Sequence, residues 1–74
     1  SIENIDATFV LCQVKNQIHI SGRSMGKINV QVILEGIGGG GNLTMAAARL
    51  NCSMDEARIK LINSLEKYLE GEEK

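Results

Sequence analysis

The stretch "EGIGGGGNLTMAAARL", residues 35–50, holds four consecutive glycines, Gly38–Gly41, between two apolar segments. A flexible linker has polar, unstructured flanks that are usually rich in serine. The flanks here are apolar and patterned, and so short a run separates two modules poorly. Consecutive glycines adopt positive φ without penalty, and successive N–H groups in such a turn converge on an anion. The run therefore predicts either a tight structural turn or part of a ligand site.

The segment before the glycines, residues 26–38 ("GKINVQVILEGIG"), fits two patterns. The apolar residues that alternate as in a strand are Ile28, Val30 and Val32. The apolar residues at the i, i+3, i+4 and i+7 spacing of a helix are Val30, Ile33, Leu34 and Ile37. Asn29 can cap such a helix, and Gly38 can end it as a left-handed residue. We therefore predict a helix here.

The N-terminal part of the chain predicts a hairpin of two strands. Residues 7–15 ("ATFVLCQVK") are apolar at both alternating sets of positions, which is typical of a strand buried on both faces. Asn16 breaks the run, and residues 17–24 ("QIHISGRS") form the second strand. The polar side chains on one face of that strand are His19, Ser21 and Arg23. Such a row indicates either a solvated sheet face or a binding surface.

The C-terminal part predicts a third strand and a second helix. Residues 44–51 ("TMAAARLN") are small and apolar, which favours a strand packed closely against a neighbour. Ser53 and Glu56 have the spacing of a capping box. The residues on one face of the following helix are Met54, Ala57, Leu61, Leu65, Tyr68 and Leu69. Gly71 is expected to stop this helix. The fold class is therefore a small α/β domain of order β-β-α-β-α.

Composition excludes several classes of function. The chain has 74 residues and a net charge of −1, so any contact with a polyanion must be local. No apolar run approaches the ~18 residues that span a membrane. The two cysteines, Cys12 and Cys52, lack metal-ligand spacing, and His19 is the only histidine, so no zinc site is predicted. Two reduced thiols are expected, with a single disulfide as the alternative.

Residues 20–48 ("ISGRSMGKINVQVILEGIGGGGNLTMAAA") resemble the DHH-associated C-terminal domain of DHH-family phosphoesterases. That family has an Arg-Ser pair at a strand end, a Gly-x-x-Asn/Asp-Val helix start, a Gly-Gly-Gly-His run and a pair of alanines. The matching residues here are Arg23, Ser24, Gly26, Asn29, Val30, Gly38 to Gly41, Ala46 and Ala47. The sequence is most similar to the GdpP-type branch, the membrane-anchored cyclic-di-AMP phosphodiesterases.

The resemblance implies that this chain is one part of a larger enzyme. In the family, an N-terminal domain carries an Asp-His-His motif and two manganese ions, and the C-terminal domain binds the substrate. The motif does not occur in residues 1–74, so we expect no catalytic metal and no catalysis by this chain alone. The family places a further strand and helix before residues 6–12 ("DATFVLC"), so the chain is expected to begin inside the domain.

The resemblance also implies that Arg23 and Ser24 bind substrate. The planar guanidinium of Arg23 suits a phosphate, and the hydroxyl of Ser24 can add a hydrogen bond. The alternative for Arg23 is a surface ion pair with Glu3 or Glu35.

The glycine run is the other implied part of the substrate site. Gly39, Gly40 and Gly41 would present N–H groups to phosphate or ribose oxygens. The family's histidine after the glycines is replaced here by Asn42, which stays neutral where histidine can carry charge. The replacement implies a weaker contact, a contact tuned to another ligand, or a parent that has lost much of its activity. Asn42 is expected to point into the cleft, and restoring histidine in the full-length parent is expected to strengthen substrate binding or raise turnover, most visibly below neutral pH.

The leading hypothesis is the substrate-binding domain of a manganese-dependent phosphodiesterase that hydrolyses cyclic-di-AMP or its linear products. The alternatives are the same domain of a soluble nano-RNase or RecJ-type exonuclease, and a degenerate nucleotide-binding or dimerisation module. The expected partners are a phosphate-bearing cyclic or linear dinucleotide, the parent's DHH domain and a second copy of the chain. The expected location is the cytoplasm, with the parent anchored in the membrane and this domain making no membrane contact.

Overall fold

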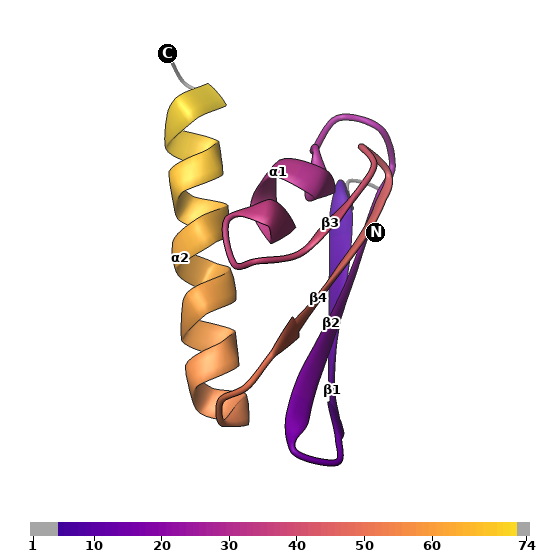
Figure 1. Cartoon of the computed structure of the whole chain (residues 1–74). Coiled ribbons are helices and arrows are strands. Elements are labelled where there is room, and N and C mark those ends of the chain that lie inside the picture. Colours follow the sequence, from indigo (N-terminus) through magenta and orange to yellow (C-terminus); the bar gives the residue numbers. More distant parts are fainter. Residues whose placement is uncertain (1–4, 73–74) are drawn as a thin grey trace.

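The computed structural model describes residues 5–72, which form one antiparallel sheet and two helices. The elements in chain order are β1 (Ala7–Val14), β2 (Gln17–Ser24), α1 (Val30–Glu35), β3 (Gly40–Gly41), β4 (Met45–Leu50) and α2 (Met54–Glu72). The strands lie in the order β1-β2-β4-β3, and both helices lie on one side of the sheet (Figure 1). The predicted β-β-α-β-α order is confirmed, with one addition: two of the glycines themselves form the short strand β3.

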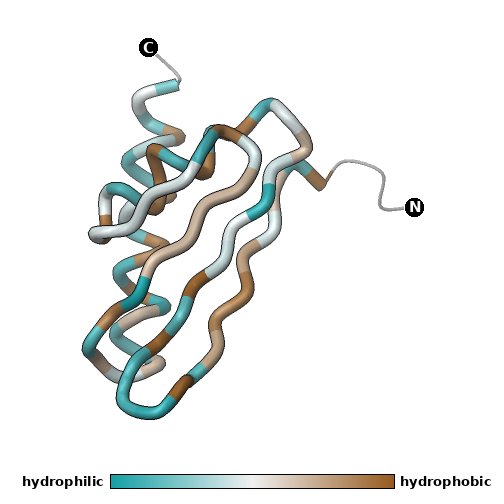
Figure 2. The backbone as a smooth tube through the Cα atoms, turned by 45° about the vertical axis from the view of Figure 1, so that its right-hand side comes forward, coloured by the Kyte–Doolittle hydropathy of each residue, from teal (hydrophilic) through white to brown (hydrophobic). Residues whose placement is uncertain are grey.

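The core lies between β2, β4 and the two helices. Ile18 and Ile20 of β2 and Ile33 and Leu34 of α1 are almost completely buried. The residues that complete this cluster are Val30, Ala46, Ala48, Leu50, Ala57 and Leu61. The small side chains of Ala46 and Ala48 let α1 lie close to β4, as the small residues of this segment predicted. Figure 2 shows the strands side by side with α2 behind them.

The prediction that residues 7–15 are buried on both faces is wrong. β1 pairs only with β2 and forms one edge of the sheet. Phe9 and Leu11 pack against the core, whereas Val10 and Val14 on the opposite face are 63% and 40% exposed. The reason is that the helices cover only one face of the sheet. The expected association with a second copy of the chain was not assigned to a particular surface, and it stays a prediction.

Helix α1 begins as predicted and ends earlier. The side-chain oxygen of Asn29 accepts hydrogen bonds from the N–H groups of Gln31 (3.0 Å) and Val32 (3.3 Å), so Asn29 is the N-cap. The α-helix ends at Glu35, and the next turn is tighter, since Gly38 N–H donates to the Glu35 carbonyl at 3.1 Å. The expected left-handed backbone at Gly38 is confirmed by its φ of 90°.

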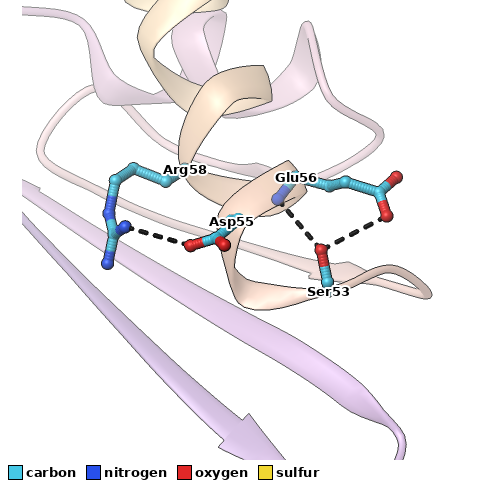
Figure 3. Close-up of polar contacts among 4 residues, drawn as sticks. All are labelled: Ser53, Asp55, Glu56 and Arg58. Atoms are coloured by element: carbon cyan, nitrogen blue, oxygen red, sulfur yellow. Dashed lines mark hydrogen bonds and ion pairs between the residues drawn. The ribbon is translucent and has the colours of Figure 1, made fainter.

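Helix α2 begins at the predicted N-cap, Ser53, but the Glu56 carboxylate bonds the Ser53 hydroxyl where a capping box would use the Ser53 N–H. Ser53 Oγ accepts a hydrogen bond from the Glu56 N–H at 3.1 Å and donates one to Glu56 Oε1 at 3.2 Å (Figure 3). The expected stop at Gly71 is wrong, because the helix continues to Glu72. A glycine costs an exposed helix only about 1 kcal/mol. The last turn is also joined by a hydrogen bond that Tyr68 donates to Glu72 Oε1 at 3.1 Å.

Replacing Ser53 with alanine is expected to lower the free energy of unfolding by about 1 kcal/mol, because the Glu56 N–H loses its acceptor. Urea unfolding followed by circular dichroism measures the change. Ser53→Asp is the matched control, since a carboxylate accepts the same bond and should stay within about 0.5 kcal/mol of the wild type. Equal stability of the alanine variant and the wild type would contradict a stabilising cap.

Candidate functional site

The face of the sheet that the helices leave uncovered carries the polar row predicted from the sequence. Strand register places residues of β1, β2 and β4 next to one another on this open face. The three cross-strand rows are Thr8–Arg23–Met45, Val10–Ser21–Ala47 and Cys12–His19–Arg49. Ser21 and Arg23 are exposed, and His19 is half-buried. Arg23 therefore stands on an accessible sheet surface, with Thr8 beside it on β1 and Met45 beside it on β4.

A shallow hollow of about 400 Å³ lies at this face where β3 borders β4. The residues that shape it include Ser21, Arg23, Gly40, Gly41, Met45 and Ala47. The fold thus brings together three of the residues predicted for the site, Arg23, Gly40 and Gly41, although they are far apart in the sequence. Ser21 belongs to the polar row that the sequence indicated as a solvated face or a binding surface, whereas Met45 was not predicted for the site.

Arg23 is exposed and available to a ligand within the described part of the chain. Among residues 5–72 the only ion pair joins Arg58 to Asp55 at 3.4 Å. Glu35, one of the two alternative partners, instead accepts a hydrogen bond from Gln31 Nε2 at 3.1 Å. The other, Glu3, lies outside the described residues. A guanidinium in this setting can offer its planar pair of N–H groups to a phosphate.

The three glycines proposed for binding have different surroundings. Gly39 donates its N–H to the Leu34 carbonyl at 2.8 Å, and a Cβ there would collide with the Ala47 carbonyl oxygen. Gly41 has a φ of 151°, and a Cβ there would lie 2.5 Å from Ala46 Cα. A Cβ on Gly40 would meet nothing within 4 Å. Gly39 therefore joins α1 to β4, and Gly40 and Gly41 border the hollow.

The backbone of β3 leaves one donor at the sheet edge. Asn42 N–H donates to the Met45 carbonyl at 2.7 Å, so these two residues form a hydrogen-bonded pair. Hydrogen-bonded and non-hydrogen-bonded pairs alternate along an antiparallel ladder. The next pair, Gly41 with Ala46, is therefore non-hydrogen-bonded, and the Gly41 N–H points away from β4. Of the two N–H groups of β3, it is the one that β4 does not engage.

Ser24 and Asn42 hold the turns next to the hollow. Ser24 Oγ accepts a hydrogen bond from Gly26 N–H at 2.9 Å. Asn42 Oδ1 accepts three bonds within its own loop, from Thr44 N–H (3.1 Å), Thr44 Oγ1 (3.2 Å) and Met45 N–H (2.9 Å). Both polar side-chain oxygens thus have intramolecular partners, and any ligand contact by Asn42 would use its amide nitrogen.

The described residues offer no metal-binding cluster and no membrane span. Residues 5–72 contain no group of three or more His, Cys, Asp or Glu side chains that could hold a metal ion. Cys12 and Cys52 are both free thiols. Neither helix in this range is long and apolar enough to cross a membrane.

Comparison with known proteins gives consistent matches. The family model described as "DHHA1 domain" matches residues 1–71. The chain is 45% identical over 74 residues to the cyclic-di-AMP phosphodiesterase PdeA of Listeria monocytogenes, covering 97% of this chain and 11% of that protein. It is 40% identical over 73 residues to the cyclic-di-AMP phosphodiesterase GdpP of Bacillus subtilis, covering 96% of this chain and 11% of that protein.

A shorter match has a different name. Over 51 residues, 68% of this chain, the sequence is 49% identical to a "membrane protein-large ribosomal subunit bL9 fusion protein" of onion yellows phytoplasma. The chain spans only about a tenth of the length of the two phosphodiesterases, 11% in each case.

Proposed function

The chain belongs to the DHHA1 domain family, and on this premise we propose that it is the substrate-binding domain of a cyclic-dinucleotide phosphodiesterase. The substrate is cyclic-di-AMP or the linear dinucleotide formed from it. Two relatives that match nearly the whole chain are named as cyclic-di-AMP phosphodiesterases, which supports this choice over an exonuclease.

The proposal rests on one observation: Arg23, Gly40 and Gly41 border the same hollow on the open sheet face. A bidentate bond from the Arg23 guanidinium fixes a phosphate by geometry as well as by charge. Gly40 carries no side chain that would keep the ligand from the backbone, and the Gly41 N–H supplies a further donor at the sheet edge. Asn42 and Ser24 hold the adjacent turns in place, and the Asn42 amide nitrogen is the remaining donor for a ligand oxygen.

In this proposal the groups that bind the substrate and the groups that catalyse hydrolysis lie on two different domains of the enzyme. Since the described residues do not group ligands for a metal, the two manganese ions are assigned to a DHH domain elsewhere in the parent protein. Those ions would activate the attacking water, while this domain holds the dinucleotide against them. The proposal also includes a membrane-anchored parent with this domain in the cytoplasm, in line with the printed name of the phytoplasma relative.

Replacing Arg23 with lysine is expected to weaken binding of a 5′-phosphorylated linear diadenylate about tenfold, because a lysine cannot form the bidentate contact. Titration followed by two-dimensional NMR measures the affinity and locates the perturbed residues. Arg58→Lys, in α2 and outside the residues that line the hollow, is the matched control and should bind as the wild type does.

Two results would contradict the proposed function. One is an Arg23→Lys variant that binds as tightly as the wild type, or perturbations that avoid β2 and β3. The other is manganese-dependent turnover by the isolated chain, which would show that it holds catalytic groups of its own.

A further inference from the structure

Cys12 stands in a row of reactive and charged side chains that the proposed function does not use. Strand register places Cys12 of β1 opposite His19 of β2, and His19 is in turn opposite Arg49 of β4. Residues directly opposite each other in an antiparallel sheet have Cβ atoms about 5 Å apart. The row lies on the open face, the side of the sheet away from α2 (Figure 2). A nucleophilic thiol, an imidazole and a guanidinium are therefore neighbours on one surface.

The Cys12 thiol is accessible to a reagent in solution. The residue is exposed, and its Sγ donates only a long hydrogen bond, to the Gln13 carbonyl at 3.8 Å. Cys52, the other cysteine of the chain, is half-buried and packs against the core. Because a thiol must be reached by its reagent to react, Cys12 is the cysteine that a reagent meets first.

The surface around Cys12 favours an anionic reagent. Arg49 is exposed, and the only ion pair among residues 5–72 joins Arg58 to Asp55, so no described carboxylate neutralises Arg49. The three cross-strand rows of the open face contain two arginines and one histidine and no acidic residue, although the whole chain has a net charge of −1. A guanidinium bonds a carboxylate with two parallel N–H groups, and an imidazole N–H adds a further donor. The row thus combines a nucleophilic sulfur with groups that recognise a carboxylate.

We propose that Cys12 is a modification site that forms a mixed disulfide with a low-molecular-weight thiol carrying carboxylates, of the glutathione class. The co-reactant is the disulfide form of that thiol. The Cys12 thiolate attacks one of the two sulfurs, the S–S bond of the reagent breaks, and the second half leaves as a thiolate that takes up the proton released by Cys12. The Cys12 sulfur is oxidised, the leaving sulfur is reduced by the same amount, and an excess of the free thiol reverses the reaction.

An adduct at Cys12 lies next to the hollow at Arg23. One row, Val10–Ser21–Ala47, separates the two. Ser21 and Ala47 of this row line the hollow. Rows on one face of a strand are two residues apart, so the border of the hollow is about 7 Å from the Cys12 row. An extended tripeptide spans roughly 10 Å and therefore covers this border. On the premise of the proposed function, modification of Cys12 closes the substrate site.

The first test measures the rate of modification of the whole chain by mass spectrometry, with oxidised glutathione and cystamine as probes. Both are symmetrical disulfides, but the first carries carboxylates and the second has only ammonium groups as its charges. Relative to their rates with free cysteine, oxidised glutathione should modify Cys12 about fivefold faster than cystamine, because its carboxylates are attracted to the row. Arg49→Gln should lose most of this preference. Arg58→Gln removes the same charge from α2 and should keep it, and Cys12→Ser should remove the fast product.

The second test measures the effect of the adduct on the hollow. The glutathione adduct should bind the 5′-phosphorylated linear diadenylate about tenfold more weakly than the unmodified chain, because the adduct obstructs the contact with Arg23. The small adduct that methyl methanethiosulfonate forms at Cys12 should bind as the unmodified chain does, since a methylthio group does not reach the hollow.

The inference is overturned if Cys52 is modified first, if the two probes react equally, or if Arg49→Gln keeps the preference. It is also overturned if the main product is two chains joined through Cys12, or if the glutathione adduct binds the diadenylate as tightly as the unmodified chain. Failure of the proposed function looks different, because Arg23→Gln would then leave diadenylate binding unchanged. The modification rates need no nucleotide, so in that case they alone decide whether Cys12 is the modification site.

Discussion

Replacing Gly39 with alanine is expected to destabilise the domain by about 3 kcal/mol or more. A Cβ at this position would collide with the Ala47 carbonyl oxygen and lie 2.7 Å from Ala48 Cβ. Neither group can move freely, since both belong to β4, a central strand whose Ala48 is part of the core. The Gly39 N–H also donates to the Leu34 carbonyl, so a shift of the backbone would break the link between α1 and the sheet.

Gly40→Ala is the matched control for this prediction, because it adds the same methyl group at the next position. A Cβ on Gly40 would meet nothing within 4 Å. The free energy of unfolding of the Gly40→Ala variant should therefore stay within about 0.5 kcal/mol of the wild-type value. Urea unfolding of the two variants measures the difference. The free energy of unfolding of a domain of this size is only about 3–5 kcal/mol, so the Gly39→Ala variant should be largely unfolded. Similar midpoints for the two variants would contradict the packing at Gly39.

The sequence predicted the elements of the domain well and their exposure less well. The hairpin, the Asn29 cap, the alanine-rich strand and the Ser53 N-cap follow from local patterns, and the structure confirms all four. Local patterns depend on neighbouring residues of the chain, which the sequence displays directly. The exposure of β1 depends on where the helices lie, because the same alternating apolar residues suit an edge strand and a central one.

The glycine run shows what sequence can and cannot resolve at the site. The run predicted unusual backbone geometry and a surface open to a ligand, and both Gly38 and Gly41 have positive φ. It could not separate Gly39, which packs against β4, from Gly40, which is open, because that difference arises from the tertiary position of β4. The similarity to DHH-associated domains was recognisable because it spans both Arg23 and the glycines, and the family match confirms it.

Asn42 is the position at which the structure most changes the expectation from sequence. As a substitute for the family's histidine, it was expected to point into the cleft and to weaken the ligand contact. Its Oδ1 accepts three hydrogen bonds from Thr44 and Met45, so the side chain organises the loop that joins β3 to β4. An imidazole offers at most one acceptor nitrogen, and none when it is protonated. A histidine at this position would therefore leave most of these loop donors without their partner.

Replacing Asn42 with histidine is accordingly expected to lower the free energy of unfolding by about 2 kcal/mol, since each lost hydrogen bond contributes about 1 kcal/mol. The loss should be larger below pH 6, where the imidazole is protonated and cannot accept. Asn42→Asp is the matched control, because its carboxylate can accept all three bonds and should preserve the loop. Urea unfolding at several pH values measures stability, and titration with the linear diadenylate measures binding in the same samples.

If the histidine variant is as stable as the wild type and binds more tightly below neutral pH, the expectation from sequence is correct, and the loop tolerates histidine although Asn42 Oδ1 accepts three hydrogen bonds there. If stability falls and binding falls with it, while Asn42→Asp keeps the fold, Asn42 acts by holding β3 in place and not by a direct contact with the ligand.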